Sequence, residues 1–272
     1  MRRHFRRKPR SRRYDVRMPR STPACCTAAL LLLAGAAVAA AEAPEVPRHL
    51  ALARELVQNV QPEDNQYVLG GETITFPGDA GSSRYAMKAD CSGFALALFA
   101  RSGYGIRTQM RFLVDTPRRR RPRAEDFVLS IEEQRGFKRI LFVADVRPGD
   151  IYAHAMLSKQ DQAETGTTGH VMIVDTAPRK IAPQPPLVAG TEQYALDVID
   201  SNEEMLGSDD TRVAHGSKPG LGRGTIRMYA DADGRLVGWA RTFRKAIFYS
   251  YDPRFKSDSR KARKAAVGRP VT

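Results

Sequence analysis

The segment DCSGFALALFAR, residues 90–101, determines how the rest of the chain is interpreted. From Cys91 onward it is apolar on nearly every side, which predicts a helix buried in the core. Asp90 stands at the expected N-cap, where a short side-chain oxygen accepts a hydrogen bond from an N–H of the first turn. The glycines within residues 102–105 end the helix. The sequence therefore places a thiol at the beginning of a buried helix.

Helical patterns lie on both sides of this segment. Residues 46–60 carry apolar side chains at helical spacing, and residues 124–135 form a second amphipathic pattern, so both are expected to be helices. Residues 67–89 are rich in Gly, Pro and Ser and are expected to form a loop.

Strand patterns follow the helical ones. Loops are expected at 158–169 and 177–191, and the strands are expected at 141–143, 151–153, 170–174, 194–202, 224–230 and 245–251. Helices first and strands second favour an α+β fold in which N-terminal helices pack on an antiparallel β-sheet. The basic and polar residues 253–272 are expected to be a disordered tail.

The first 41 residues have the three parts of a secretory signal peptide. A basic segment precedes a short apolar segment, and small residues follow at Ala39–Ala41, where cleavage is expected. Either Met1 or Met18 would serve as the start of such a signal. A retained membrane anchor is the alternative, but the apolar segment is short for a span. We therefore expect a periplasmic or secreted protein with no mature transmembrane segment and a catalytic domain over residues 42–252.

The charge of the chain lies mainly in this leader. Ten of the 44 Lys and Arg residues and one of the 30 acidic residues precede residue 42, so the net charge falls from +14 to +5 without them. The basic run 118–123 is expected to be a solvated loop, with polyanion binding as the alternative. Neither a phosphate-binding glycine loop nor a metal-ligand spacing is present in the sequence. We expect no nucleic-acid partner, cofactor or metal.

The cysteines point to nucleophilic chemistry. Cys25 and Cys26 lie in the leader, which leaves Cys91 alone in the mature chain. A single cysteine with histidines elsewhere is a candidate nucleophile, although an inert buried thiol is the alternative. The start of a helix favours a thiolate, and its N–H groups are suited to stabilising an oxyanion.

Five histidines are candidates for the general base. His4 lies in the leader and His49 on the expected solvent side of the first helix. Of His154, His170 and His215, we favour His170, because it begins an apolar strand and would lie at the rim of the sheet. His215 stays a rival base.

A third polar group should orient the imidazole. If strands 170–174 and 194–202 are antiparallel neighbours, the start of the first lies beside the end of the second. Asp200 and Asn202 are found there, and we favour Asp200.

Four motifs together resemble a known family. Residues 90–94 are similar to the D-C-S-G-[FL] signature of NlpC-type cell-wall cysteine peptidases. Residues 67–71 resemble its Y-x-x-G-G element, residues 147–150 its P-G-D turn, and residues 169–173 its x-H-V-x-I strand. The four occur in the family's order, and the resemblance spans residues 50–202.

The resemblance implies a papain-like fold and hydrolysis of amide bonds in peptidoglycan stem peptides, often between γ-D-glutamyl and diaminopimelyl residues. It makes Cys91 the nucleophile, His170 the base, and Asp200 the orienting group. Tyr67 would lie near the oxyanion. The positions expected to contact the peptide substrate are Tyr67, Asp90 and Ser92.

The sequence also departs from the family. The third position is often His there, and it is Asp200 here. The segments 67–91 and 104–147 are long, and Gly216 and the glycine-rich residues 220–224 have no counterpart. An amidase or acyltransferase acting on another substrate is therefore an alternative, as is an inactive domain that binds wall peptides. We expect a monomer.

Overall fold

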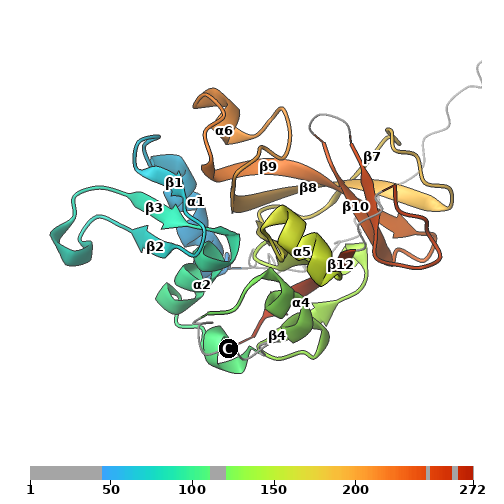
Figure 1. Cartoon of the computed structure of the whole chain (residues 1–272), viewed down its shortest axis with the longest axis horizontal. Helices are drawn as coiled ribbons and strands as arrows, with labels where there is room; N and C mark the ends of the chain where they lie inside the picture. Colours follow the sequence, from blue (N-terminus) through green and yellow to red (C-terminus); the bar gives the residue numbers. More distant parts are fainter. Residues whose placement is uncertain (1–44, 111–120, 243–245, 259–262, 272) are drawn as a thin grey trace, which may run out of the picture. The chain divides into compact units, whose positions relative to one another are not determined.

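A computed structural model describes residues 45–110, 121–242, 246–258 and 263–271, which form a mixed α+β fold (Figure 1). The α-helices in these ranges are α1 (Arg48–Asn59), α2 (Cys91–Arg101), α3 (Ile106–Gln109), α4 (Ala124–Glu132), α5 (Lys159–Thr165) and α6 (Thr211–Ala214). The predicted helices at 46–60, 91–101 and 124–135 are confirmed as α1, α2 and α4.

Twelve strands lie in the same ranges and form two sheets. The smaller sheet has the order β1-β3-β2, from β1 (Asn65–Tyr67), β2 (Glu72–Thr75) and β3 (Ala86–Ala89). The larger sheet has the order β11-β10-β9-β8-β6-β5-β12-β4, with β7 paired to β8. Its strands are β4 (Phe137–Ile140), β5 (Ile151–Met156), β6 (Gly169–Val174), β7 (Arg179–Ile181), β8 (Thr191–Asn202), β9 (Gly220–Asp231), β10 (Leu236–Arg241), β11 (Phe248–Ser250) and β12 (Arg263–Pro270).

All strand pairs of the larger sheet are antiparallel, as the sequence predicts. One face carries the helices. Phe94 and Leu98 of α2 share a buried cluster with Val171 and Ile173 of β6. Burial of each such side chain contributes about 1.5–3 kcal/mol. The apolar face of α2 therefore fixes this helix, and the thiol at its start, against the centre of the sheet.

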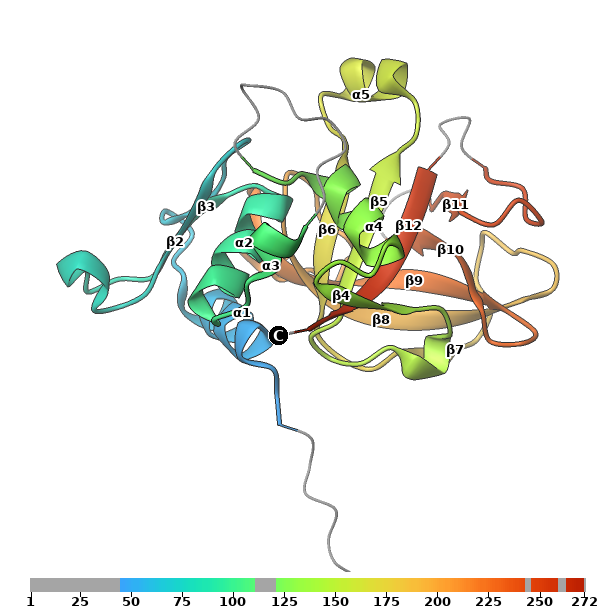
Figure 2. The ribbon, with the colours of Figure 1, turned by 90° about the horizontal axis from the view of Figure 1, so that it is seen from below.

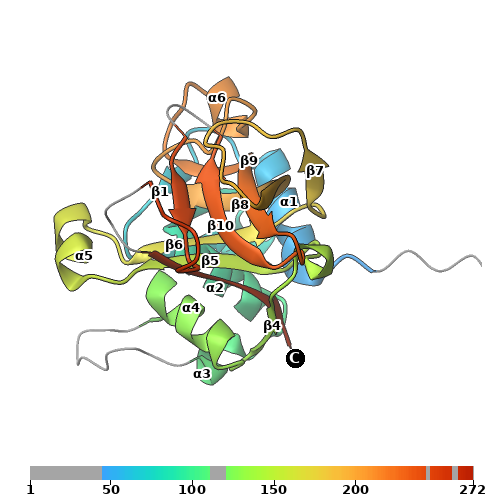
Figure 3. The ribbon, with the colours of Figure 1, turned by 90° about the vertical axis from the view of Figure 1, so that its right-hand side faces the viewer.

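The opposite face of the sheet is covered by its own strands. Alternate residues of β5 and β6, such as Tyr152 and Met172, share a second cluster with Ile226 and Trp239 of β9 and β10. The rings of Tyr152 and Trp239 are 6.1 Å apart. In Figure 3, α2 and α4 lie below β5 and β6, whereas β8, β9 and β10 rise above them. The sheet thus bends over itself and buries both faces.

The expectation that residues 253–272 form a disordered tail is wrong for its last part. Strand β12 lies inside the sheet, paired with β5 on one side and β4 on the other (Figure 2). Arg269 of β12 donates two hydrogen bonds to Asp150, at 2.8 and 3.0 Å. The many charged residues of 253–272 do not form a recognisable strand pattern, although Ala265, Ala266 and Val267 of β12 are buried.

Four other local expectations are wrong, and one of them is the expected loop 177–191, which contains β7. Residues 67–89 contain β2 and β3, because Met87 and Ala89 alternate into the core while the intervening residue faces outward. The expected loop 158–169 contains α5, which is capped by the Ser158 hydroxyl and projects beyond β5 and β6 (Figure 2). Residues 141–143 follow β4 and are not a strand, whereas β10 was not predicted.

Candidate functional site

Cys91 is the first residue of α2. Asp90 caps the helix as predicted, because its Oδ1 accepts a hydrogen bond from the N–H of Gly93 at 2.8 Å. Its carbonyl accepts another from the N–H of Phe94. Within the described part of the chain, the N–H groups of Cys91 and Ser92 have no acceptor. Both are therefore available to a negative charge at this end of the helix.

The segment 67–71 is fastened to the start of α2. The N–H of Gly70 donates to Asp90 Oδ2 at 2.8 Å, and the N–H of Asp90 donates to the carbonyl of Gly71 at 3.3 Å. A Cβ on Gly93 would lie 2.0 Å from the carbonyl oxygen of Gly71, so this approach requires glycine. The first two sequence motifs thus form one unit around the thiol.

The imidazole of His170 lies between Cys91 and Asp200. Strands β6 and β8 are antiparallel neighbours, so the start of β6 faces the end of β8 as predicted. His170 Nε2 is 2.6 Å from Asp200 Oδ2, and the ring lies close enough to Cys91 for that residue to raise the pKa of His170. Because Nε2 faces the carboxylate, Nδ1 is the ring nitrogen left for the thiol. Cys91, His170 and Asp200 therefore lie next to one another in that order, and a hydrogen bond joins the last two.

Gly169, at the start of β6, allows the chain to place His170 in this position. Gly169 precedes His170 and has φ +143°, a conformation that residues with a Cβ rarely adopt. A Cβ there would lie 1.9 Å from the carbonyl oxygen of His154 on the neighbouring strand. Gly169 therefore permits the close strand approach beside which His170 is held.

The charges around His170 favour its protonated form. Burial lowers the pKa of His170, but the negative charge on Cys91 and the hydrogen bond to Asp200 outweigh it and raise the pKa to about 9. Only 12 % of the His170 side chain is exposed. At neutral pH the site therefore favours an imidazolium beside the Cys91 sulfur.

Asp200 is fully buried and stays ionised. Burial raises the pKa of Asp200, but the positive charge of Arg212 and the hydrogen bond from His170 hold it below its ordinary value. Arg212 Nη2 donates to Oδ1 at 2.9 Å, and Asn202 Nδ2 donates to Oδ2 at 3.1 Å. It is thus Asp200 that contacts the imidazole, while Asn202, the second choice from the sequence, contacts Asp200.

A cavity of about 380 Å³ opens beside Cys91. It is large enough for part of a small molecule or a peptide segment. Its lining comes from the 67–71 segment, the start of α2, the residues before α4 and the turn before β6: Tyr67, Leu69, Gly70, Asp90, Cys91, Ser92, Arg121, Arg123, Ala124, Gly166, Thr167, Thr168 and Gly169. The cavity therefore gives a substrate direct access to the sulfur.

The expected substrate contacts differ in how free they are. Tyr67 lines the cavity, and burial together with the charges of Cys91 and Asp90 raises the pKa of its hydroxyl. Ser92 donates to Asp90 Oδ1 at 3.0 Å and accepts from Arg121 Nη1 at 2.8 Å. Asp90 and Ser92 thus line the cavity, but their side chains are already hydrogen-bonded within the protein.

The basic run 118–123 lies only partly within the described residues. Arg121 is not a solvated side chain, because it is 14 % exposed and ion-pairs with Asp90. Arg123 is exposed and lines the cavity. No local pattern points to Arg121, because its partner Asp90 lies 31 residues earlier.

The remaining histidines have other places. His49 is buried against the Gly149 carbonyl at 2.7 Å, so its predicted position on the solvent side is wrong. His154 lies opposite His170 on the neighbouring strand β5 and stacks on Trp239, and burial together with the positive charges of Arg263 and His170 keeps its pKa well below the ordinary value. His215 follows α6, is exposed and does not line the cavity.

A viral protein is similar to part of this chain. The uncharacterized protein R653 of Acanthamoeba polyphaga mimivirus is 29% identical over 171 residues, which cover 61% of this chain and 73% of that protein. Neither a protein-family model nor a solved structure matches the chain.

The described residues contain no cluster of three or more His, Cys, Asp or Glu arranged to hold a metal ion. No helix in those ranges combines the length and apolar character that a membrane span requires. The signal peptide, Met18 and the cleavage site at Ala39–Ala41 lie outside the described residues, so they stay predictions.

Proposed function

We propose that this protein is a cysteine hydrolase that cleaves amide bonds in peptidoglycan stem peptides. The observation that carries the proposal is the hydrogen bond between His170 and Asp200, with Cys91 close to the same imidazole at a helix start beside an open cavity. A thiol, an imidazole and an orienting carboxylate in this order are the parts of a catalytic triad.

In the proposed reaction each group has its own step. The Cys91 thiolate attacks the substrate carbonyl carbon, and the N–H groups of Cys91 and Ser92 stabilise the negative oxygen that forms. The His170 imidazolium gives its proton to the leaving amine, which leaves an acyl group on the sulfur as a thioester. Water then attacks the thioester, His170 accepts its proton, and the acid product departs as the Cys91 thiolate and the imidazolium re-form.

The substrate class is supported by the sequence. The four motifs that resemble the NlpC-type peptidases, and the papain-like fold that they imply, favour a wall peptide. In the structure, two of these motifs surround the thiol, a third carries the imidazole, and the fourth contains Asp150, which binds Arg269. The net charge of +5 for residues 42–272 suits an anionic wall surface.

Replacement of Cys91 tests the proposal most directly. Purified muropeptides are incubated with the wild-type protein and with Cys91→Ala, His170→Ala and His215→Ala, and the fragments are identified by mass spectrometry. We expect Cys91→Ala and His170→Ala to lose turnover and His215→Ala, the control, to keep it. Turnover that persists in folded Cys91→Ala would exclude the proposed nucleophile.

The same digestion separates the alternatives. Cleavage within a stem peptide supports the peptidase. Activity restricted to amides or esters outside these peptides would identify an amidase or acyltransferase, and tight binding without products would identify a wall-binding domain. A buried, ionised Asp200 beside an imidazole favours catalysis, because peptide binding alone does not require it.

A further inference from the structure

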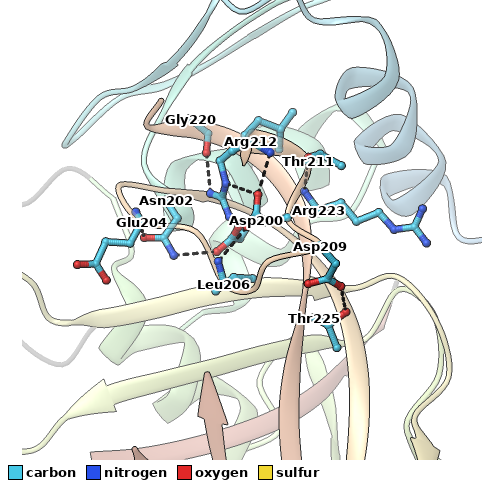
Figure 4. Close-up of polar contacts among 12 residues, drawn as sticks. Asp200, Asn202, Glu204, Leu206, Asp209, Thr211, Arg212, Gly220, Arg223 and Thr225 are labelled. Carbon is cyan, nitrogen blue, oxygen red and sulfur yellow. Dashed lines mark hydrogen bonds and ion pairs between the residues drawn. The ribbon is translucent and has the colours of Figure 1, made fainter. Parts of the chain in front are cut away.

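The loop that follows β8 returns to Asp200 through α6. Residues 203–219 leave the end of β8, anchor Met205 and Leu206 in the core, and form α6 before β9 begins. Arg212 lies on α6, and its guanidinium points back at Asp200 (Figure 4). This part of the chain has no counterpart in the motifs that support the proposed function.

Arg212 has a partner for each part of its guanidinium. Nη2 donates to Asp200 Oδ1 at 2.9 Å and to Asp210 Oδ2 at 2.6 Å. Nε donates to Asp210 Oδ1 at 2.8 Å, and Nη1 donates to the carbonyl of Gly220 at 3.0 Å. Arg212 and both carboxylates are at most 2 % exposed. The orientation of the guanidinium is therefore fixed on every side (Figure 4).

The glycine-rich start of β9 makes room for this arrangement. A Cβ on Gly222 would lie 2.5 Å from Arg212 Nε, and a Cβ on Gly224 would lie 2.9 Å from Asp210 Oδ2. Residues two apart on a strand face the same side. The alternating glycines thus remove the side chains that would otherwise occupy the place of the Arg212–Asp210 pair.

Stability alone does not account for a buried group of three charges. Apolar side chains of similar volume commonly stabilise a core as well or better. The arrangement instead divides the two oxygens of Asp200. Arg212 binds Oδ1, and Oδ2 is left to face His170. A buried positive charge also keeps this carboxylate ionised.

We propose that Arg212 is a positioning residue of the site, which acts through Asp200 to aim and charge the carboxylate that orients His170. Asp210 and the glycines of β9 hold Arg212 in place. The inference rests on the proposed function for the meaning of the site, but its test does not require a substrate.

The test measures the titration of His170 by NMR of the ¹⁵N-labelled imidazole. We compare the wild-type protein with Arg212→Met, Arg212→Lys, Asp200→Asn and the double variant Asp200→Asn/Arg212→Met. In Arg212→Met the midpoint of His170 is expected to fall by about one pH unit or more, because Asp200 takes up a proton when its cation is removed. Arg212→Lys keeps the charge, so its His170 midpoint is expected to lie between those of the wild-type protein and Arg212→Met.

The double variant separates positioning from general structure. If Arg212 acts through Asp200, the double variant has the same His170 midpoint as Asp200→Asn alone. Additive shifts, or a wild-type midpoint in folded Arg212→Met, would overturn the inference. If Arg212→Met does not fold, Arg212→Gln removes the same charge, and an unchanged midpoint in that variant overturns the inference equally.

Arg227 provides a matched control. It is 4 % exposed, lies on the same strand as the glycines, and donates to the carbonyls of Gln184 and Pro185 far from the imidazole. Arg227→Met is expected to lower the urea midpoint of unfolding without moving the His170 midpoint. A failure of the proposed function would be seen in a separate measurement. The rate at which iodoacetamide labels Cys91 would then be the same in His170→Ala as in the wild-type protein.

Discussion

Two buried aspartates flank the Cys91 thiol, and each is bound by one arginine. Asp90, at the start of α2, accepts hydrogen bonds from the backbone N–H groups of Gly70 and Gly93. Asp200, at the end of β8, accepts one from the imidazole of His170. The first carboxylate therefore organises main chain, and the second organises a group that takes part in proton transfer.

The two pairs also differ in their surroundings. Arg121, the partner of Asp90, lines the open cavity, whereas Arg212, the partner of Asp200, is 2 % exposed. Charges interact more strongly where water is excluded. We therefore expect changes at Asp90 to act on the stability of the fold and changes at Asp200 to act on the chemistry of the site.

The largest difference is expected when each aspartate is replaced by asparagine. Asp200→Asn is expected to lower kcat by up to about 10⁴-fold, the loss found when the orienting carboxylate of a triad becomes an amide. Asp90→Asn is expected to cause a smaller loss of kcat and to lower the free energy of unfolding by about 1–3 kcal/mol, because the amide still caps the helix but leaves the charge of Arg121 without its partner. Turnover of muropeptides and urea unfolding measure the two effects.

Equal losses of kcat in the two variants would end the distinction between them. Asn202→Ala serves as a control on the sheet side, because Asn202 contacts Asp200 without contacting the imidazole. It is expected to lower kcat less than Asp200→Asn does.

A smaller effect is expected at the glycine on each side of the thiol. Gly93→Ala and Gly169→Ala each bring a Cβ to 2.0 Å or less from a carbonyl oxygen, and such overpacking costs about 1–3 kcal/mol. Gly169→Ala is expected to be the more destabilising, because its φ of +143° also disfavours alanine. The free energy of unfolding in urea measures both.

Controls separate crowding from backbone conformation. Gly105 has its nearest neighbours at 3.7 Å, and Gly234 has φ +79° with nothing within 4 Å. Gly105→Ala is expected to be nearly neutral, and Gly234→Ala to show the cost of the conformation alone. If Gly93→Ala is no worse than Gly105→Ala, the close contact with the 67–71 segment does not stabilise the site.

The same comparison shows what the sequence could predict. The helix at 91–101 and its Asp90 cap follow from patterns within a few residues, and the structure contains both. The contact between His170 and Asp200 followed from two recognisable strands and the rule that antiparallel neighbours face start to end. In each case the information lay in short, regular segments.

The arginines were not predicted, for a physical reason. Each binds its aspartate across a loop, and a loop's path depends on packing that no local pattern records. The alternating glycines 220, 222 and 224 were a usable signal, because a strand face without side chains implies that something bulky packs there. Strand β12 was missed because its partners β4 and β5 lie more than 100 residues earlier.

The smallest expected effect is a shift in the pH dependence of turnover. His170 must be protonated to give a proton to the leaving amine, and its pKa is raised to about 9 by Cys91 and Asp200 against the effect of burial. We therefore expect kcat to be retained at neutral pH and to fall as the pH rises through about 9. Circular dichroism over the same range shows whether the fold persists.

Asp90 and Asp200 should differ in how they move this fall. The Asp200 carboxylate stabilises the imidazolium, so Asp200→Asn lowers the pKa of His170 and the residual kcat falls at a lower pH. A shift of one pH unit corresponds to about 1.4 kcal/mol. Asp90 has no contact with the ring within the described residues, so Asp90→Asn is expected to leave the fall near pH 9. If both variants shift the pH at which kcat falls by the same amount, the two carboxylates have the same electrostatic effect on His170. The distinction between a structural and a chemical aspartate then fails.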